Sequence, residues 1–514
     1  MSARQQTNAL TLAALLPTEV LCVLEQQQLL SSEQLSAELG ELVLDSRQVQ
    51  AGDTFVAVPG YSADGRKFIA AAIDAGAALV LAEGDQIAVR AEKNIPIIEL
   101  PELNQQLSAL AGRYFGEPTQ SMFGVGITGT NGKTSCSYWL AHLLDACGSS
   151  AAIVGTLGYG CVGKSLVETG MTTPDAIATQ RVLAECQQQG AENVVMEVSS
   201  HSLDQGRVAA VGFDVAIFTN LSRDHLDYHG SEAAYRDAKL KLMAMPGLQR
   251  AVINLDDAAA QSFIAAAQAA AAPVWRYSIN NAQADIYCSQ LAYGQQGVSA
   301  RLHTPMGECD IAAPVIGAFN VSNLLAVIAG ALAKGLSLET IAKAVSTLPA
   351  VPGRMQPVAN ELDLTVLVDY AHTPDALASV LKAVKGHSQG QLWCVFGCGG
   401  DRDQGKRPQM GQIADSLADR IVVTSDNPRG EEPDHIIAQI TAGITKTETA
   451  VVVEDRAEAI RYAVNHAQTG DCIVLAGKGH ETYQQIGVEK LPFDDVVQAR
   501  LALQQRSEQQ GGNA

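Results

Sequence analysis

Short apolar runs alternate with longer amphipathic stretches along most of the chain, a pattern that indicates parallel β-strands connected by helices. In the middle of the chain the clearest apolar runs cover residues 122–127, 194–198, 214–218 and 251–254. These runs are continuously apolar, as is typical of strands buried on both faces of a sheet. The sequence therefore predicts an α/β protein with a mostly parallel central sheet.

The same rhythm returns after Val351-Pro-Gly-Arg354, where Pro and Gly interrupt the preceding helix. Strands are expected there at 366–368, 392–396, 421–423, 451–453 and 472–475, and earlier in the chain at 41–45, 54–58 and 78–82. A chain of 514 residues is too long for one core. We therefore predict three domains, over residues 1–105, 106–350 and 351–514. The Ala-rich stretch 264–272 is expected to form a surface helix, and the polar tail after Gln504 to be disordered.

Composition narrows the partners of such a protein. The net charge of −20 argues against nucleic acid, because phosphate backbones require a basic surface. The ten cysteines include no C-x-x-C pair, which favours reduced thiols over disulfides or a metal site. No apolar run approaches the ~20 residues of a membrane span. We expect a cytoplasmic protein that acts on small molecules, as a monomer, with phosphate groups held by local cations and helix N-termini.

A glycine-rich turn follows the first central strand and opens a helix. Its residues are Gly129, Thr130, Asn131, Gly132, Lys133, Thr134 and Ser135. Backbone N–H groups at such a helix N-terminus converge on phosphate oxygens, while Lys133 would reach the terminal phosphates and Thr134 would bind Mg²⁺. Ile127 stands where the usual P-loop pattern has its first glycine, so a shortened loop is expected. The turn predicts a nucleoside triphosphate site, and a glycine turn with a solvated lysine is the alternative.

Two more polar clusters follow central strands. Glu197 ends the strand at 194–198, and a carboxylate near a P-loop is the usual ligand of nucleotide-bound Mg²⁺. The loop 219–230 contains Asp224 and His225, which could bind a second metal or form ordinary loop hydrogen bonds. Lys239 lies on the next helix. From the residues alone, a solvated helix lysine is the expected interpretation.

Polar clusters also follow four strands of the last segment. They are Val368–Pro374, Phe396–Arg407, Asp426–Arg429 and Ala476–Glu481. Ligands of open α/β sheets bind beyond the carboxyl ends of the strands, so these clusters are candidate site residues. Asp369 could meet a ribose hydroxyl, and the glycines and cations of the second cluster could hold an anion.

Together these motifs resemble the Mur ligases of peptidoglycan synthesis over nearly the whole chain. The resemblance implies a UDP-substrate domain, a central P-loop ATPase-like domain and a C-terminal Rossmann-like domain for the incoming amino acid. Within the family, the motifs are most similar to the branch that adds meso-2,6-diaminopimelate to UDP-N-acetylmuramoyl-L-alanyl-D-glutamate. ATP and Mg²⁺ are the implied cofactors, and cell-wall synthesis, cell shape and cell division are the implied context.

The resemblance also implies ligands for individual residues. For ATP these are residues 129–135 together with Asn320, Arg354 and Asp369. For the UDP substrate they are Leu44, Ser46, Tyr61, Ser62, Ala63, Met171, Thr172, Thr173, Ser199, Gln205 and Arg207, with Met171 where many relatives have Asn. For Mg²⁺ they are Thr134, Glu197, His225 and Lys239. Relatives carbamylate this lysine, which replaces a repelling ammonium by a negative oxygen pair. Lys133, Lys239 and His225 are the implied catalytic residues.

For diaminopimelate the resemblance implies Arg402, Asp426, Asn427, Pro428, Arg429, Gly477 and Glu481. This substrate ends distally in an amine and a carboxylate, whereas lysine ends in an amine only. Arg429 offers a planar fork to the extra carboxylate, and Glu481 can meet the ammonium. Loss of one charge-assisted hydrogen bond costs about 1.5–3 kcal/mol, enough to decide between the two substrates. Arg429 is therefore the predicted specificity residue.

The implied reaction is the ATP-dependent formation of an amide. The D-glutamyl γ-carboxylate attacks the γ-phosphorus of ATP to give an acyl phosphate, and the amine of diaminopimelate then displaces phosphate. His201, His225 or His372 could assist removal of the amine proton, and the sequence does not choose among them. Two alternatives stay open: a ligase similar to folylpolyglutamate synthetase, and a P-loop protein that hydrolyses ATP without forming a bond.

Overall fold

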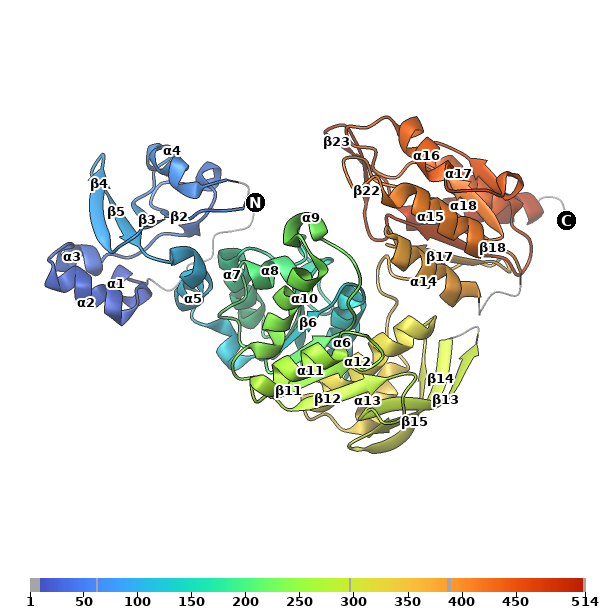
Figure 1. Cartoon of the computed structure of the whole chain (residues 1–514), viewed down its shortest axis with the longest axis horizontal. Helices are drawn as coiled ribbons and strands as arrows, with labels where there is room; N and C mark the ends of the chain where they lie inside the picture. The colour runs from blue at the N-terminus through green and yellow to red at the C-terminus, as the bar shows by residue number, and fades with distance from the viewer. Residues whose placement is uncertain (1–9, 62, 295–296, 386–389, 512–514) are drawn as a thin grey trace.

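The computed structural model describes residues 10–61, 63–294, 297–385 and 390–511, and its main sheets lie in three separate lobes (Figure 1). The first sheet has the order β1-β2-β3-β5-β4 and is parallel except for the β4–β5 pair. Its strands are β1 (Leu42–Val43), β2 (Thr54–Ala57), β3 (Leu79–Glu83), β4 (Ala88–Glu92) and β5 (Ile95–Leu100). The helices beside it are α1 (Leu12–Leu15), α2 (Thr18–Gln26), α3 (Ser32–Leu35), α4 (Ile69–Asp74) and α5 (Leu103–Tyr114).

The central sheet has ten strands in the order β15-β14-β13-β12-β11-β10-β6-β9-β7-β8. Its parallel part comprises β6 (Phe123–Thr128), β7 (Ala151–Gly155), β9 (Asn193–Glu197), β10 (Val215–Phe218), β11 (Arg250–Asn254), β12 (Val274–Ser278) and β13 (Ile286–Gly294). Antiparallel strands extend both edges: β8 (Gly158–Cys161) on one side, β14 (Gly297–Thr304) and β15 (Gly307–Ala313) on the other.

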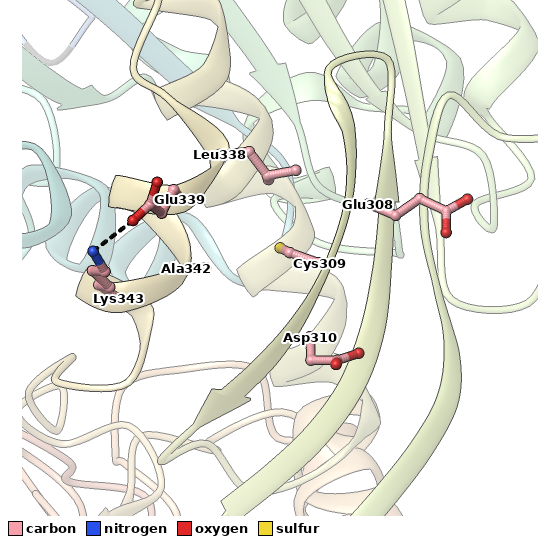
Figure 2. Close-up of a pocket in the computed structure, with 7 residues that line it drawn as sticks. All are labelled: Glu308, Cys309, Asp310, Leu338, Glu339, Ala342 and Lys343. Atoms are coloured by element: carbon pink, nitrogen blue, oxygen red, sulfur yellow. Dashed lines mark hydrogen bonds and ion pairs between the residues drawn. The ribbon is translucent and has the colours of Figure 1, made fainter.

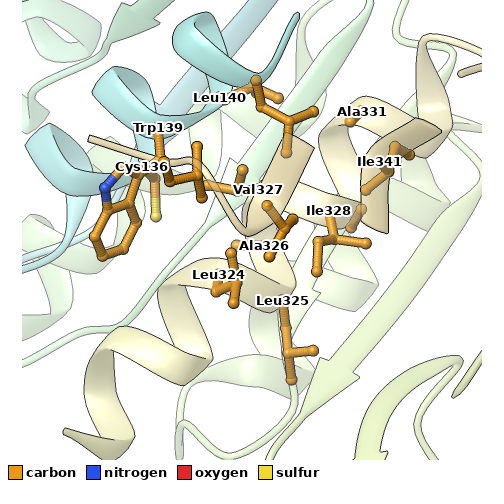
Figure 3. Close-up of a cluster of buried hydrophobic side chains, with 14 of the residues drawn as sticks. Cys136, Trp139, Leu140, Leu324, Leu325, Ala326, Val327, Ile328, Ala331 and Ile341 are labelled. Carbon is orange, nitrogen blue, oxygen red and sulfur yellow. The ribbon is translucent and has the colours of Figure 1, made fainter. Parts of the chain in front are cut away.

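Helices cover both faces of the central sheet. On one face lie α6 (Lys133–Ala146), α12 (Ala318–Ala333) and α13 (Leu338–Val345), and on the other lie α7 (Ala176–Gln188), α8 (Ser200–Asp204) and α11 (Ala260–Ala269). Figure 3 shows how α6 and α12 interlock, with Trp139 and Leu140 packed beside Leu324 and Val327. A Cβ on Gly330 would lie 2.8 Å from the Leu140 side chain, so the small residue allows this close packing. The helix that carries the predicted nucleotide loop is therefore rigidly seated.

The third sheet has the order β16-β17-β21-β18-β19-β20 and is parallel apart from the β16–β17 pair. Its strands are β16 (Gln356–Pro357), β17 (Thr365–Asp369), β18 (Leu392–Phe396), β19 (Arg420–Val423), β20 (Ala450–Val452) and β21 (Cys472–Ala476). The helices are α14 (Pro374–Lys385), α15 (Lys406–Leu417), α16 (Pro433–Thr441), α17 (Arg456–His466) and α18 (Asp495–Gly511), and a separate hairpin joins β22 (Tyr483–Ile486) to β23 (Glu489–Pro492).

The predicted α/β class is confirmed, but two expectations about the chain differ from the structure. Every apolar run named above forms a strand, whereas β4, β5, β7, β8, β12–β16, β22 and β23 were not predicted. The prediction of a disordered tail after Gln504 is wrong for residues 505–511, which continue α18. Arg506 ties this last part down by donating to the carbonyl oxygen of Ala467 at 2.8 Å. Within the described residues, no helix has both the length and the apolar character needed to cross a bilayer.

Candidate active site

The predicted phosphate loop connects β6 to α6 and is held in place by the end of β10. Thr219 donates to the carbonyl oxygen of Asn131 at 2.6 Å, and the Asn220 side chain accepts from the Asn131 N–H at 2.9 Å. A Cβ on Gly129 would lie 1.9 Å from the Thr219 hydroxyl oxygen, and Gly132 has φ +86° directly before the helix. Both positions therefore require glycine, and the shortened loop keeps its N–H groups at the start of α6.

Two lysines converge on one carbonyl oxygen of this loop. Lys133 Nζ and Lys239 Nζ each donate to the Gly129 oxygen at 2.8 Å. Lys239 lies on α10 (Glu232–Leu240) with only 1 % of its surface exposed, so the interpretation as a solvated helix lysine is wrong. Burial, and then the neighbouring Lys133, lower the pKa of Lys239 well below its usual range. The surroundings of Lys239 therefore disfavour its charged ammonium form, unlike those of a lysine in solvent.

Glu197 ends β9 next to the loop and is 1 % exposed. Its carboxylate accepts from the Thr134 hydroxyl at 3.0 Å, and from the backbone N–H and hydroxyl of Thr156 at 2.8 and 3.1 Å. Among the ion pairs of the described residues, none involves Glu197. A buried anion beside a hydroxyl oxygen is the donor set that a hard divalent cation prefers, so these two residues fit Mg²⁺.

His225 lies further from this pair, before α9 (Leu226–His229), with φ +52°. Its backbone N–H donates to the Asp224 side chain at 2.9 Å, and its ring centroid is 4.9 Å from that of His201. Burial lowers the pKa of both histidines, that of His201 to about 4. Within the described parts of the chain, no three His, Cys, Asp or Glu side chains gather as a metal-binding group. The predicted Mg²⁺ set therefore depends on the Thr134 hydroxyl and on a modified Lys239.

The third lobe contributes Arg354 to the phosphate loop. Its Nη2 atom lies 3.5 Å from the Thr134 hydroxyl oxygen, and its guanidinium carbon lies 4.4 Å from the Tyr370 ring centroid. Asp369 accepts from the backbone N–H of Met355 at 2.7 Å, so it anchors the chain directly after Arg354. Burial raises the pKa of Asp369. The structure thus places Arg354 at the loop and Asp369 behind it, while their roles in binding ATP stay predictions.

Asn320 is linked to the loop indirectly, by way of the neighbouring side chain of Asn323. Asn323 donates to the Asn320 side-chain oxygen at 3.2 Å, and a Cβ on Gly132 would lie 2.4 Å from the Asn323 oxygen. Asn323 was not predicted, although it shares the helix turn with Asn320. Its one-turn spacing from Asn320 at the start of α12 was the available signal.

The central-lobe residues that are predicted to hold the UDP substrate form one connected group. Arg207 donates to Gln205 and to the carbonyl oxygen of Thr173, and its Nη1 lies 3.7 Å from the Met171 sulfur. Thr173 accepts from the backbone N–H of Ser199 at 3.1 Å. Thr172 accepts from Thr156, which also touches Glu197. The group therefore joins the nucleotide site directly.

The first-lobe residues are less closely gathered. Leu44 and Ser46 lie where β1 leads into a short 3₁₀ turn, and Ala63 is exposed on a loop. Tyr61 is 77 % exposed, yet its ring lies 4.9 Å from that of Tyr228, which accepts from the Gln205 amide. The predicted residue Ser62 lies outside the described residues. Tyr61 thus points the first lobe toward the central group.

In the third lobe, most of the residues predicted for diaminopimelate cluster on the loops that follow β19 and β21. Asn427 donates to Glu481 at 2.7 Å, and a Cβ on Gly477 would lie 2.6 Å from the Asp426 carboxylate. Pro428 is buried, and Arg429 donates to the Gly400 oxygen at 2.8 Å. Arg402 is exposed and contacts only its neighbour Asp401, at 3.5 Å, in the hydrogen bonds of the described residues. The structure does not bring Arg402 into the cluster.

Comparison with known proteins agrees with this geometry. Three family descriptions match: the "Mur ligase family, catalytic domain" over residues 39–115, the "Mur ligase middle domain" over 127–331 and the "Mur ligase, glutamate ligase domain" over 353–479. The chain belongs to the Mur ligase family. A relative from Ectopseudomonas mendocina is 49 % identical over 93 % of this chain and 97 % of its own length, and is named UDP-N-acetylmuramoyl-L-alanyl-D-glutamate--2,6-diaminopimelate ligase. A relative of the same name from Synechococcus elongatus is 45 % identical over 97 % and 99 %.

Solved structures match the Mur ligase architecture as well. One structure with the same ligase name has a TM-score of 0.71 at 36 % identity and covers 97 % of this chain and 100 % of its own. A MurF ligase from Thermotoga maritima in complex with ADP has a TM-score of 0.63 at 17 % identity, over 91 % and 98 %. A folylpolyglutamate synthase from Mycobacterium tuberculosis has a TM-score of 0.61 at 18 %, over 73 % and 92 %. The last two show the shared fold.

Two surface cavities lie outside these clusters or beside them. Figure 2 shows one of about 410 Å³ between β15 and α13, where Glu339 and Lys343 form an exposed ion pair at 2.7 Å. None of its lining residues is a predicted site residue. The other, of about 400 Å³, is lined by residues of α6 and β8 together with Pro352 and His480. Burial lowers the pKa of His480 to about 4, so its ring is neutral at physiological pH.

Proposed function

We propose that this chain is an ATP-dependent amide ligase that adds meso-2,6-diaminopimelate to the D-glutamate of UDP-N-acetylmuramoyl-L-alanyl-D-glutamate. Relatives that carry this ligase name are similar over more than nine-tenths of the chain. The observation that carries the proposal is the contact between Arg354 of the third lobe and Thr134 of the phosphate loop. Because that loop and the amino-acid cluster lie on different lobes, such a contact lets the two reactants meet.

The three lobes take different substrates in this proposal. Residues 1–105 hold the uridine end through Leu44, Ser46 and the Tyr61 loop, and residues 106–350 hold ATP and the peptide end. Residues 351–514 hold diaminopimelate. The Thr173, Gln205 and Arg207 group supports this arrangement, because it links the Tyr228 side facing the first lobe to Glu197 beside the loop. The monomeric state expected from the sequence stays a prediction.

Thr134 and Glu197 would hold Mg²⁺, and His225 and a carbamate on Lys239 would be its further ligands. When bound, it neutralises negative charge on the transferring phosphoryl group. The amine of Lys239 attacks CO₂, forms an N–C bond and releases one proton, which leaves a carbamate anion. The lowered pKa of Lys239 supports this step, because only the neutral amine is a nucleophile. The shared Gly129 oxygen keeps Lys133 and Lys239 close enough for the anion to offset the Lys133 charge.

Lys133, the loop N–H groups and Arg354 stabilise the phosphoryl group as the D-glutamyl carboxylate attacks the γ-phosphorus. The amine of diaminopimelate then attacks the carbonyl carbon of the acyl phosphate, and phosphate leaves with one of the former carboxylate oxygens. An acyl phosphate hydrolyses readily, so closure of the lobes must exclude water. His201 and His225 are both deprotonated at neutral pH and can accept a proton from the attacking amine.

Phosphate release measured with all three substrates tests this function. We expect release only when ATP, UDP-N-acetylmuramoyl-L-alanyl-D-glutamate and an amino acid are present together, with meso-diaminopimelate far better than L-lysine. Phosphate release at the same rate without the other two substrates would instead identify an ATPase that forms no bond. Turnover with a folate and glutamate would identify a folylpolyglutamate synthetase-like ligase. The single-substrate omissions serve as controls on the same enzyme preparation.

A further inference from the structure

Lys478 is a fully buried cation beneath the proposed diaminopimelate site. Its side chain has no exposed surface, and it lies on the turn after β21. Nζ donates to the Asn427 side-chain oxygen and to Glu481 Oε2, both at 3.1 Å. Its Nζ also lies 5.7 Å from the Tyr483 ring centroid. Burying an ammonium costs free energy unless it is paired with hydrogen-bond acceptors. Lys478 therefore keeps both contacts, and they hold the Asn427 and Glu481 side chains in place.

The two carboxylate oxygens of Glu481 differ in their hydrogen bonds. Oε2 accepts from Lys478 and also from the Asn427 amide at 2.7 Å. Among the hydrogen bonds of the described residues, none uses Oε1. The Asn427 oxygen is held too, because it accepts from the Gln485 backbone N–H at 2.9 Å. The carboxylate is therefore fixed at one oxygen and presents the other to a ligand.

Charges of both signs lie around this position. Asp426 and Glu481 are carboxylates, and Lys478 and Arg429 are cations. Asp401, which accepts from the Gly430 N–H at 3.0 Å, is a further carboxylate on the exposed side. Two more pairs lie around them and are neutral in themselves. Arg407 forms a bidentate pair with Glu431, and Arg456 forms one with Asp495 that is completely buried. A pocket in which positive and negative groups lie apart suits a zwitterion, which is what the distal end of diaminopimelate is.

We propose that Lys478 is a positioning residue that sets specificity for the zwitterionic end over the ammonium end of lysine. It holds Glu481 so that Oε1 meets the distal ammonium, and its charge keeps the pocket from repelling the distal carboxylate. Without Lys478 the pocket would lose one positive charge, which favours a lone ammonium over a zwitterion. The inference deepens the proposed function and rests on it, since it concerns the same amino-acid site.

The test compares kcat/KM for meso-diaminopimelate and for L-lysine in Lys478→Met and Lys478→Gln. We expect the ratio of the two values to fall about tenfold in Lys478→Met, the size expected for one charge-assisted contact. Lys478→Gln should lose less, because its amide can still donate to Glu481. KM for ATP should stay within about twofold in both, since neither variant touches the phosphate loop. Lys490→Met is the matched control, because Lys490 lies 4.0 Å from the same Tyr483 ring centroid without contacting Asn427 or Glu481.

The thermal unfolding temperature of each variant is measured first. If Lys478→Met does not fold, the kcat/KM ratio is compared in Lys478→Gln instead. An equal loss with both amino acids, at an unchanged ratio, would overturn the inference and leave only a structural role. In a Glu481→Gln background, Lys478→Met should have a smaller effect on the ratio, and full additivity would also overturn it. Absence of any three-substrate turnover in the unmodified chain would instead refute the proposed function. The two failures are therefore distinguishable.

Discussion

Removal of the Arg429 guanidinium should damage the use of diaminopimelate while sparing ATP. The structure holds this side chain on a fixed backbone, because the Arg429 N–H donates to the Gln485 oxygen at 3.0 Å and the Arg429 oxygen accepts from Gly487 at 2.7 Å. Within the described residues, Nη1 is the only nitrogen of the Arg429 guanidinium that donates a hydrogen bond, and its acceptor is the Gly400 oxygen. The rest of the fork is free for a carboxylate.

The size of the effect follows from that free fork. Loss of one charge-assisted contact costs about 1.5–3 kcal/mol, so KM for meso-diaminopimelate should rise about 10- to 100-fold in Arg429→Ala. Arg429→Lys should recover only part of this, because an ammonium cannot form two parallel hydrogen bonds. Arg429 has φ +52°, so Arg429→Gly removes the same guanidinium and also relieves about 1 kcal/mol of backbone strain. Both truncations should therefore raise KM equally, with the glycine variant the more stable of the two.

Initial rates of phosphate release at varied diaminopimelate, lysine and ATP provide the assay. Arg461→Ala is the matched control, because Arg461 is a partly exposed arginine of the same lobe that pairs, within the described residues, only with Glu458. The control should leave the KM values for diaminopimelate, lysine and ATP unchanged. Equal rises in KM for ATP and for diaminopimelate, or an equal loss with lysine, would refute the assignment of the fork to the distal carboxylate.

Three other outcomes are expected. Lys133→Ala should lower phosphate release by about 10²- to 10³-fold, because it removes a donor to the transferring group, and near-normal turnover would contradict the loop assignment. Lys239→Ala should be nearly inactive and regain part of its activity with short-chain carboxylates, whereas full activity without them would exclude a carbamate. The Arg407 pair holds the pKa of Glu431 at about 2, below its usual 4.5, so its stabilising effect is present above pH 4.5 and is lost as the pH falls toward 2. Urea unfolding of Glu431→Gln against the unmodified chain should therefore show a difference at pH 7 that shrinks over this range.

Much of the fold was predictable because buried parallel strands leave a strong local pattern. The runs at 122–127 and 392–396 are apolar without interruption and form β6 and β18. β13 and β14 were missed because their polar and apolar residues alternate weakly at the edge of the sheet, with exposed residues such as Tyr293. The helical tail was missed because its stability comes from contacts of Leu503 and Arg506 with α17, which lies far away in the sequence. Polar composition alone does not reveal such packing.

The site was predictable where a motif carries its own chemistry. The glycine loop, Glu197 and Asp426–Arg429 follow strands directly, so their shared edge follows from the topology. Burial of Lys239 could not be read from the residues, since it depends on how α10 seats against the loop. Lys478 was passed over for the same reason, because a lysine between two glycines is typical of an exposed turn. Long-range packing, rather than local sequence, converts both lysines into parts of the site.

The transfer of oxygen from carboxylate to phosphate tests the central claim most directly. UDP-N-acetylmuramoyl-L-alanyl-D-glutamate labelled with ¹⁸O in the γ-carboxylate is incubated with ATP and meso-diaminopimelate, and the released phosphate is analysed by mass spectrometry. The account predicts phosphate that carries one ¹⁸O per amide formed, because the attacking carboxylate oxygen leaves with the phosphoryl group. Unlabelled phosphate alongside amide formation would contradict an acyl phosphate, and with it the proposed roles of the loop, Lys133 and Arg354 in phosphoryl transfer.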